Sequence, residues 1–226
     1  MMHDQGTTPI GAHPVSPSQA NADLDLYENI INHVAAGENY YDAAARELRL
    51  GNYPLKPFVA FRLPTLAVVQ GAAFGGAVGL VACCDMAIGA HDALFSLSEV
   101  RIGLAPAVIS PFVVKALGER ATRRYAMTGE RFSGERAREL GLLSETYAAA
   151  ELDDALHGWL DNLMLNSPQA MRASKDLLRE ASSASVSPAL RRYTENAIAR
   201  IRVSPEGQEG LNAFLEKRKP RWLGEV

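Results

Sequence analysis

Cysteine is scarce in this sequence, and its two cysteines are neighbours. Cys83 and Cys84 follow each other in an apolar stretch. They therefore provide neither a disulfide framework nor the C-x-x-C spacing of a metal site, and we expect a protein of the reducing cytoplasm. No apolar run reaches transmembrane length, and the first residues lack the charged-then-apolar pattern of a signal peptide.

A strong excess of charge of either sign is also missing. The formal net charge is −3 at pH 7, which gives no indication of a nucleic-acid or membrane partner. The sequence contains no internal repeat. Because 47% of the 226 residues are hydrophobic, we expect one well-buried core, with a small helical appendage.

Nucleotide-binding motifs are absent as well. A phosphate loop of the Walker type needs Gly-Lys-Ser/Thr, and a dinucleotide site needs G-x-G-x-x-G, but the glycines here fall at 71, 75, 76 and 79. The chain has instead a short apolar run at 66–69, a glycine- and alanine-rich turn at 71–76, a small-residue helix ending near Asp85, and a second apolar run at 86–88. This order predicts strand, turn, helix and strand.

The glycine turn is the first candidate site. Gly75 and Gly76 lack side chains, so a ligand can approach the backbone, and the start of a helix directs free N–H groups outward. Such N–H groups can hold a phosphate or a developing oxyanion. The alternative is that these glycines serve only the tight packing of a helix on a strand.

Glu99 is the second candidate. It stands among the apolar residues Leu97, Val100 and Ile102, and a glycine turn follows. A carboxylate in such surroundings has its charged form disfavoured, which suits a general acid or base near neutral pH. The alternative is a surface ion pair between Glu99 and Arg101.

Several blocks around these candidates follow one another in a familiar order. They are residues 70–80 (QGAAFGGAVGL), 84–88 (CDMAI) and 95–106 (FSLSEVRIGLAP). Together they resemble the crotonase (enoyl-CoA hydratase/isomerase) superfamily, and residues 105–114 (APAVISPFVV) are similar to bacterial 3-methylglutaconyl-CoA hydratases. The resemblance runs from Pro64 to Trp222. It implies an α/β fold, a crotonase-like (ClpP/crotonase) spiral of ββα turns with a C-terminal helical trimerisation region.

The resemblance also implies catalytic roles. Glu99 would handle water and the proton, while the N–H groups of Gly76 and Ala22 would form the oxyanion hole. Ala22 belongs to an Ala-Asn-Ala-Asp-Leu segment, in which Asn21 replaces a glycine of the family. A chance match of small residues is the alternative for this segment.

Gly79 marks a departure from the family pattern. Hydratases of the family usually carry a second glutamate at this position in the helix, and the glycine puts a mechanism with two carboxylates in doubt. We interpret Gly79 as a mark of the methylglutaconyl branch. A double-bond isomerase that uses Glu99 alone stays open.

The implied substrate is an acyl-CoA thioester, so CoA is a substrate and neither a cofactor nor a metal is implied. The implied assembly is a homotrimer or hexamer, in which Phe214 and Lys217 would approach the adenine end of CoA, often in a neighbouring subunit. The residues that the resemblance implies in substrate and CoA binding are Ala20, Asp23, Gly71, Ala73, Gly75, Pro106, Ala107, Phe214 and Lys217.

The expected domain organisation has three parts. These are a flexible leader (1–19), a crotonase-like core (20–147) and a C-terminal helical region (148–226). Since the family carries further ββα layers before the core, we expect a truncated member. Three functions are open: hydration of a branched enoyl-CoA such as 3-methylglutaconyl-CoA in leucine or acyclic terpene breakdown, a non-catalytic paralogue that binds CoA esters or partner subunits, and the isomerase.

Further elements are predicted from periodicity and punctuation. Helices are expected over 24–34, 42–50, 106–117, 120–127 and 134–140, and a strand over 142–147. Most of the rest is expected to be helical. Ser167, Ser187 and Ser204 each precede a proline and are predicted N-caps. Lys175 and the nearby arginines are interpreted mostly as a solvated face.

Overall fold

The computed structural model describes residues 61–224, which belong to one compact unit of the chain, Phe58–Val226. The predicted leader, the predicted helices over 24–34 and 42–50, and the segment 20–24 lie outside the described residues.

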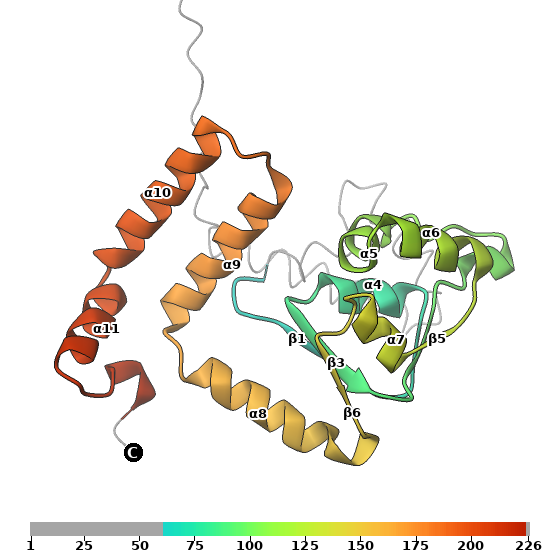
Figure 1. The fold of residues 1–226 in the computed structure, drawn as a ribbon, viewed down its shortest axis with the longest axis horizontal. Coiled ribbons are helices and arrows are strands. Elements are labelled where there is room, and N and C mark those ends of the chain that lie inside the picture. Colours follow the sequence, from blue (N-terminus) through green and yellow to red (C-terminus); the bar gives the residue numbers. More distant parts are fainter. Residues whose placement is uncertain (1–60, 225–226) are drawn as a thin grey trace, which may run out of the picture. The chain divides into compact units, whose positions relative to one another are not determined.

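The described strands form two three-stranded sheets. The first has the order β1-β3-β6 and is parallel throughout; it contains β1 (Leu66–Val69), β3 (Met86–Ala90) and β6 (Glu145–Tyr147). The second has the order β2-β4-β5, with β5 antiparallel to β4; it contains β2 (Ala72–Phe74), β4 (Leu94–Ser96) and β5 (Phe132–Ser133). Figure 1 shows β1, β3 and β6 side by side. Because β1 leads into β2 and β3 into β4, the chain steps from one sheet to the other twice, as a spiral of ββα turns requires.

Helices follow the strands. They are α4 (Gly76–Cys83), α5 (Ser110–Leu117), α6 (Glu119–Thr128) and α7 (Gly134–Glu139), together with the 3₁₀ turn η1 (Glu99–Ile102). The core between them holds Ile88, Phe95, Leu97 and Leu143, all of which are fully buried. Phe132 stacks on Phe95 with ring centroids 5.5 Å apart, which joins β5 to β4.

Three predicted boundaries are corrected by the structure. The segment 71–76 does not lead directly into a helix, because β2 pairs with β4 between the two glycine positions. The predicted helix over 106–117 begins only at Ser110, and before it the Ala107 N–H turns back onto the Ala105 carbonyl at 2.8 Å, which closes a turn tighter than a helical one. The predicted strand over 142–147 is confined to β6. Strand β5 was not predicted at all.

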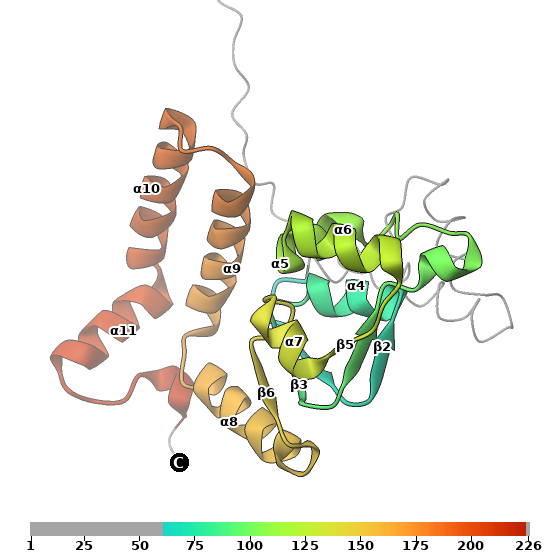
Figure 2. The same cartoon turned by 45° about the vertical axis from the view of Figure 1, so that its right-hand side comes forward.

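Four further helices complete the described chain (Figure 2). They are α8 (Leu152–Met164), α9 (Pro168–Ser183), α10 (Pro188–Arg202) and α11 (Pro205–Leu215), followed by a 3₁₀ turn, η3 (Arg221–Leu223). The three predicted serine N-caps are confirmed. Ser167, Ser187 and Ser204 each accept a hydrogen bond from the N–H three residues later, as an N-cap does.

Lys175 on α9 corrects the prediction of a solvated face. Its side chain is only 10% exposed, and its Nζ lies 2.7 Å from Asp85 Oδ2 and donates to the Leu63 carbonyl at 2.9 Å. The same Asp85 oxygen accepts hydrogen bonds from the N–H and the hydroxyl of Thr65. This cluster connects α9 to the residues just before β1 and just after α4.

Candidate active site

The glycine turn at the start of α4 leaves the Gly76 N–H without a hydrogen-bond acceptor among the described residues. Gly75, the N-cap, has φ 54° and ψ −120°, a backbone conformation that essentially only glycine adopts, and its N–H donates to the Ser96 carbonyl at 2.9 Å. The next amide, that of Gly76, is the first of the helix, and no described residue accepts a hydrogen bond from it. The turn therefore presents the Gly76 N–H at the positive end of a helix, where it can bind an oxyanion.

Glu99 begins η1, three residues after the end of β4. Its residue is only 2% exposed, and among the residues that the structure describes its Oε2 has no hydrogen-bond partner. Burial raises the pKa of the Glu99 carboxyl above its ordinary value. A buried carboxyl with an unpartnered oxygen and a raised pKa has the properties of a proton-transfer group.

Arg101 does not form the ion pair that was the alternative for Glu99. Its Nε donates instead to the carbonyl of Gly129 at 3.0 Å. The Ser96 hydroxyl donates to the same carbonyl at 3.1 Å. Sequence reasoning missed the site residues Ser96 and Gly129. The glycine after α6 signals a helix cap, but its contacts with residues 28 and 33 positions away are set only by the fold.

Gly79 lies in tight contact with the start of α5. A Cβ on Gly79 would lie 2.1 Å from Ile109 Cγ2 and 2.6 Å from Ile109 Cβ, far inside contact distance. Ile109 is 3% exposed. The place where a second carboxylate would begin is therefore filled by an aliphatic side chain.

The other residues predicted for the acyl-CoA site are only partly brought together. Gly71 precedes β2, and its carbonyl accepts from the Leu94 N–H at 2.8 Å. The Ala73 side chain is buried in β2, while Pro106 is half-buried and Ala107 is exposed before α5. The predicted residues Ala20, Ala22 and Asp23 lie outside the described residues.

Phe214 and Lys217 lie at the end of α11 and in the turn after it. The Phe214 side chain is 81% exposed, and Lys217 has a positive φ of 54°. The chain then folds back. Arg218 forms a bidentate ion pair with Glu209, and Trp222 Nε1 donates to the Leu165 carbonyl at 3.2 Å.

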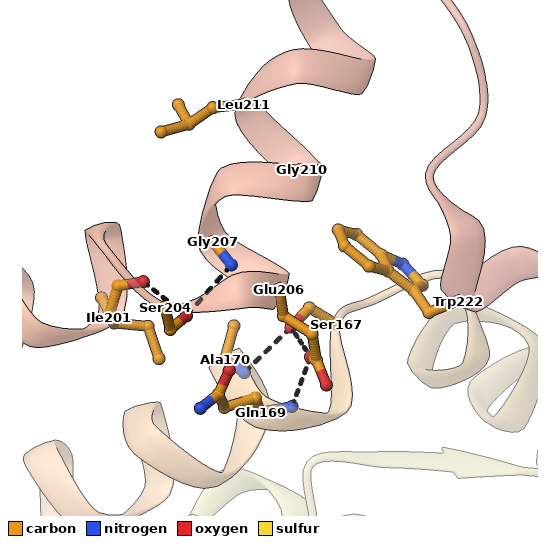
Figure 3. A pocket seen from close by; sticks show the side chains of 10 residues that line it. All are labelled: Ser167, Gln169, Ala170, Ile201, Ser204, Glu206, Gly207, Gly210, Leu211 and Trp222. Atoms are coloured by element: carbon orange, nitrogen blue, oxygen red, sulfur yellow. Dashed lines mark hydrogen bonds between the residues drawn. The ribbon is translucent and has the colours of Figure 1, made fainter.

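A cavity of about 250 Å³ lies between α9, α11 and Trp222 (Figure 3). Glu206 lines this cavity, and one of its carboxylate oxygens accepts hydrogen bonds from the Ser167 hydroxyl and from the Gln169 N–H. The Glu206 carboxylate thus provides an acceptor for an N–H in the first turn of α9 that has no partner within the helix. The cavity shares no lining residue with the glycine turn or with Glu99.

Comparison with known proteins gives the class of this chain. The family model for enoyl-CoA hydratase/isomerase matches residues 35–225. A Thermus thermophilus protein that is provisionally named an enoyl-CoA hydratase is 30% identical over 206 residues, which cover 90% of this chain and 78% of that protein. A peroxisomal Delta(3,5)-Delta(2,4)-dienoyl-CoA isomerase of Arabidopsis thaliana is 31% identical over 163 residues, covering 71% of this chain but 58% of the isomerase. The crystal structure of an enoyl-CoA hydratase from Shewanella pealeana superposes with a TM-score of 0.75 and 38% identity, over 91% of this chain and 86% of that one.

The chain therefore belongs to the enoyl-CoA hydratase/isomerase family and has the crotonase-like fold. Members of this family act on CoA esters and commonly form oligomers. No described helix has the length and apolar character needed to cross a membrane. Residues 61–224 contain no cluster of three or more His, Cys, Asp and Glu side chains suited to a metal ion.

Proposed function

We propose that this chain catalyses proton transfer on a branched enoyl-CoA thioester, in the manner of a 3-methylglutaconyl-CoA hydratase. The observation that carries the proposal is the combination of the Gly76 N–H with the buried Glu99 Oε2, neither of which has a hydrogen-bond partner among the described residues. The two groups are supplied by two successive ββα turns, and the hydrogen bond from Gly75 to Ser96 connects those turns.

The Gly76 N–H would donate a hydrogen bond to the thioester carbonyl oxygen. Negative charge develops on this oxygen when a nucleophile adds to the enoyl double bond or when an α-proton leaves, and a donor at a helix start stabilises that charge. Ala22 is the proposed second donor. One such donor typically contributes about a hundred- to a thousandfold in rate.

Glu99 would move the proton. In hydration, its carboxylate would take a proton from water as the oxygen adds to the β-carbon, and the carboxyl would then return a proton to the α-carbon of the enolate. Atoms and charge balance over these two steps without any further group. A raised pKa brings Glu99 closer to neutral pH, where it can both accept and release a proton.

The isomerase is the second candidate, and the contact between Gly79 and Ile109 favours it. With an aliphatic side chain at the position of a second carboxylate, a single acid/base can remove a proton from one carbon of the acyl chain and return it to another. The similarity to a dienoyl-CoA isomerase supports this candidate.

A substrate panel separates the two candidates. The purified chain would be incubated with 3-methylglutaconyl-CoA and, separately, with a β,γ-unsaturated acyl-CoA, and the products would be separated by chromatography and identified by mass and by proton NMR. A gain of one water supports the hydratase, while a shifted double bond at unchanged mass supports the isomerase. Neither product from either ester, with no binding of either ester by calorimetry, would contradict both.

A further inference from the structure

One backbone carbonyl receives both side-chain anchors of the candidate active site. Gly129 follows α6 with φ 61°, and its N–H closes the helix by donating to the Tyr125 carbonyl at 2.9 Å. Its own carbonyl accepts from Ser96 Oγ and from Arg101 Nε. We call these three groups the Gly129 anchor.

The Gly129 anchor fixes the chain before and after Glu99. Ser96 stands three residues before Glu99 and Arg101 two residues after it, so the intervening turn is fixed at both ends. Carbonyls at the end of a helix carry partial negative charge, which favours the Arg101 guanidinium there. Ser96 is 2% exposed, so its hydrogen bond to the Gly129 carbonyl is shielded from solvent.

Ser96 also reaches the oxyanion side of the site. Its carbonyl accepts the Gly75 N–H at 2.9 Å, and this bond sets the orientation of the peptide that precedes the Gly76 amide. A Cβ on Gly129 would lie 2.9 Å from Arg101 Nε, so a side chain there would displace the guanidinium from the Gly129 carbonyl. The Gly129 backbone therefore packs closely against Arg101, and its carbonyl binds both Arg101 and Ser96.

We propose that Ser96 and Arg101 are positioning residues, which use the shared Gly129 carbonyl to hold the Gly75–Gly76 turn and Glu99 at a fixed separation. The inference rests on the proposed function, in which the oxyanion donor and the proton-transfer group must face the same thioester. Misplacement of such groups by about 1 Å can cost about a hundredfold in rate.

The test compares Ser96→Ala and Arg101→Met with two matched controls. Thr122→Val removes another buried hydroxyl, which donates to the Gly118 carbonyl at 2.8 Å, and Arg138→Met removes a surface arginine paired with Glu145. Turnover of 3-methylglutaconyl-CoA and of a β,γ-unsaturated acyl-CoA would be followed together with hydrogen exchange at the Gly75 amide.

We expect kcat to fall about ten- to a hundredfold in both anchor variants while KM stays within about threefold. Exchange at Gly75 should rise about tenfold in Ser96→Ala. The Thr122→Val control should be less stable than the wild type, but its kcat and its exchange rate at Gly75 should stay unchanged. Anchor variants that keep the wild-type kcat, or lose no more of it than Thr122→Val, would overturn the inference.

The exchange measurement separates this inference from the proposed function. If the wild-type chain neither converts nor binds either ester, the proposed function is wrong, yet exchange at Gly75 still reports on the anchor. Unchanged protection of Gly75 in both variants would then overturn the inference, and loss of protection confined to the anchor variants would support it.

Discussion

Gly79 on α4 and Ile109 at the start of α5 compete for the same space. A Cβ on Gly79 would lie 2.1 Å from Ile109 Cγ2 and 2.6 Å from its Cβ, but 3.6 Å from its Cα. A side chain at 79 therefore requires Ile109 to shift or to be replaced by a smaller residue. We therefore expect that substitution at position 79 alone does not place a second carboxylate in the site.

Substitutions at the two positions, made singly and together, test this relationship. Gly79→Ala and Ile109→Gly should each destabilise the protein, by about 1–3 kcal/mol for the overpacked alanine and more for the lost isoleucine. The double variant should lose less than the two changes predict together, with a coupling of about 1–3 kcal/mol in denaturant unfolding. Gly158→Ala is the control, since nothing lies within 4 Å of that helical glycine.

Additive effects of Gly79→Ala and Ile109→Gly would show that the two positions are independent. Gly79→Glu alone should fail to raise hydration of 3-methylglutaconyl-CoA. A gain in hydration would mean that Ile109 moves aside at little cost.

The ion pair of Lys175 with Asp85 should contribute measurably to stability. Lys175→Met removes the mostly buried ammonium group that pairs with the Asp85 carboxylate and donates to the Leu63 carbonyl. We expect a loss of about 2 kcal/mol in the free energy of unfolding, because charged hydrogen bonds of low exposure are strong. The exposed pair of Arg138 with Glu145 serves as the control, and Arg138→Met should cost less than about 0.5 kcal/mol. Equal losses in the two variants would refute a special role for Lys175.

Glu209 should make the turn after α11 sensitive to acid. Its hydrogen bond from Arg218, aided by the Arg221 N–H, lowers the pKa of the carboxyl to about 2 from 4.5. A depressed pKa stabilises the folded form above the unfolded pKa, and this contribution is lost as pH falls from about 4.5 through about 2. The fluorescence of Trp222, read in a Trp159→Phe background, should change over that interval.

Glu209→Gln should reproduce the acid form of this turn at neutral pH. The matched control is Glu139→Gln, which removes a carboxylate from an exposed pair with Arg136. If Glu209→Gln left the Trp222 emission as it is in the parent, the carboxylate would not be what holds this turn.

The exposed apolar side chains of the C-terminal helices predict self-association. Ile198 is 62% exposed, Phe214 81% and Leu215 75%. Such a set is unusual for a lone chain in water, and we expect light scattering to give a multiple of three 24.4 kDa chains. Ile198→Asp should reduce the mass, whereas Met127→Asp, on α6 and 71% exposed, should leave it unchanged. A monomer at micromolar concentration would contradict this prediction.

Local chemistry made part of this structure predictable from sequence. The three Ser-Pro caps, the apolar strands β1 and β3, and the glycine turn before α4 depend on residues close in the chain. The blocks around Gly76 and Glu99 were specific enough to indicate the family, which the comparisons confirm. The narrower assignment to 3-methylglutaconyl-CoA hydratases stays a proposal.

What the sequence could not supply were relationships between distant residues. Strand β2 is short and rich in alanine, and it exists because β4 pairs with it 22 positions later. The apparent pair of Glu99 with Arg101 was suggested by proximity along the chain, but a carbonyl 28 residues away attracts the arginine instead. The polar residues around Lys175 in the sequence suggested an exposed helix face, and only the fold brings this lysine to Asp85.

The most direct test of the central claim is the turnover number of Glu99→Gln with the ester that the wild-type chain converts, measured beside the binding of that ester. The substitution keeps the size of the side chain and removes its ability to accept and return a proton. We predict that kcat falls by at least about a thousandfold while the dissociation constant stays within about threefold. Equal turnover by Glu99→Gln and the wild type would contradict the account.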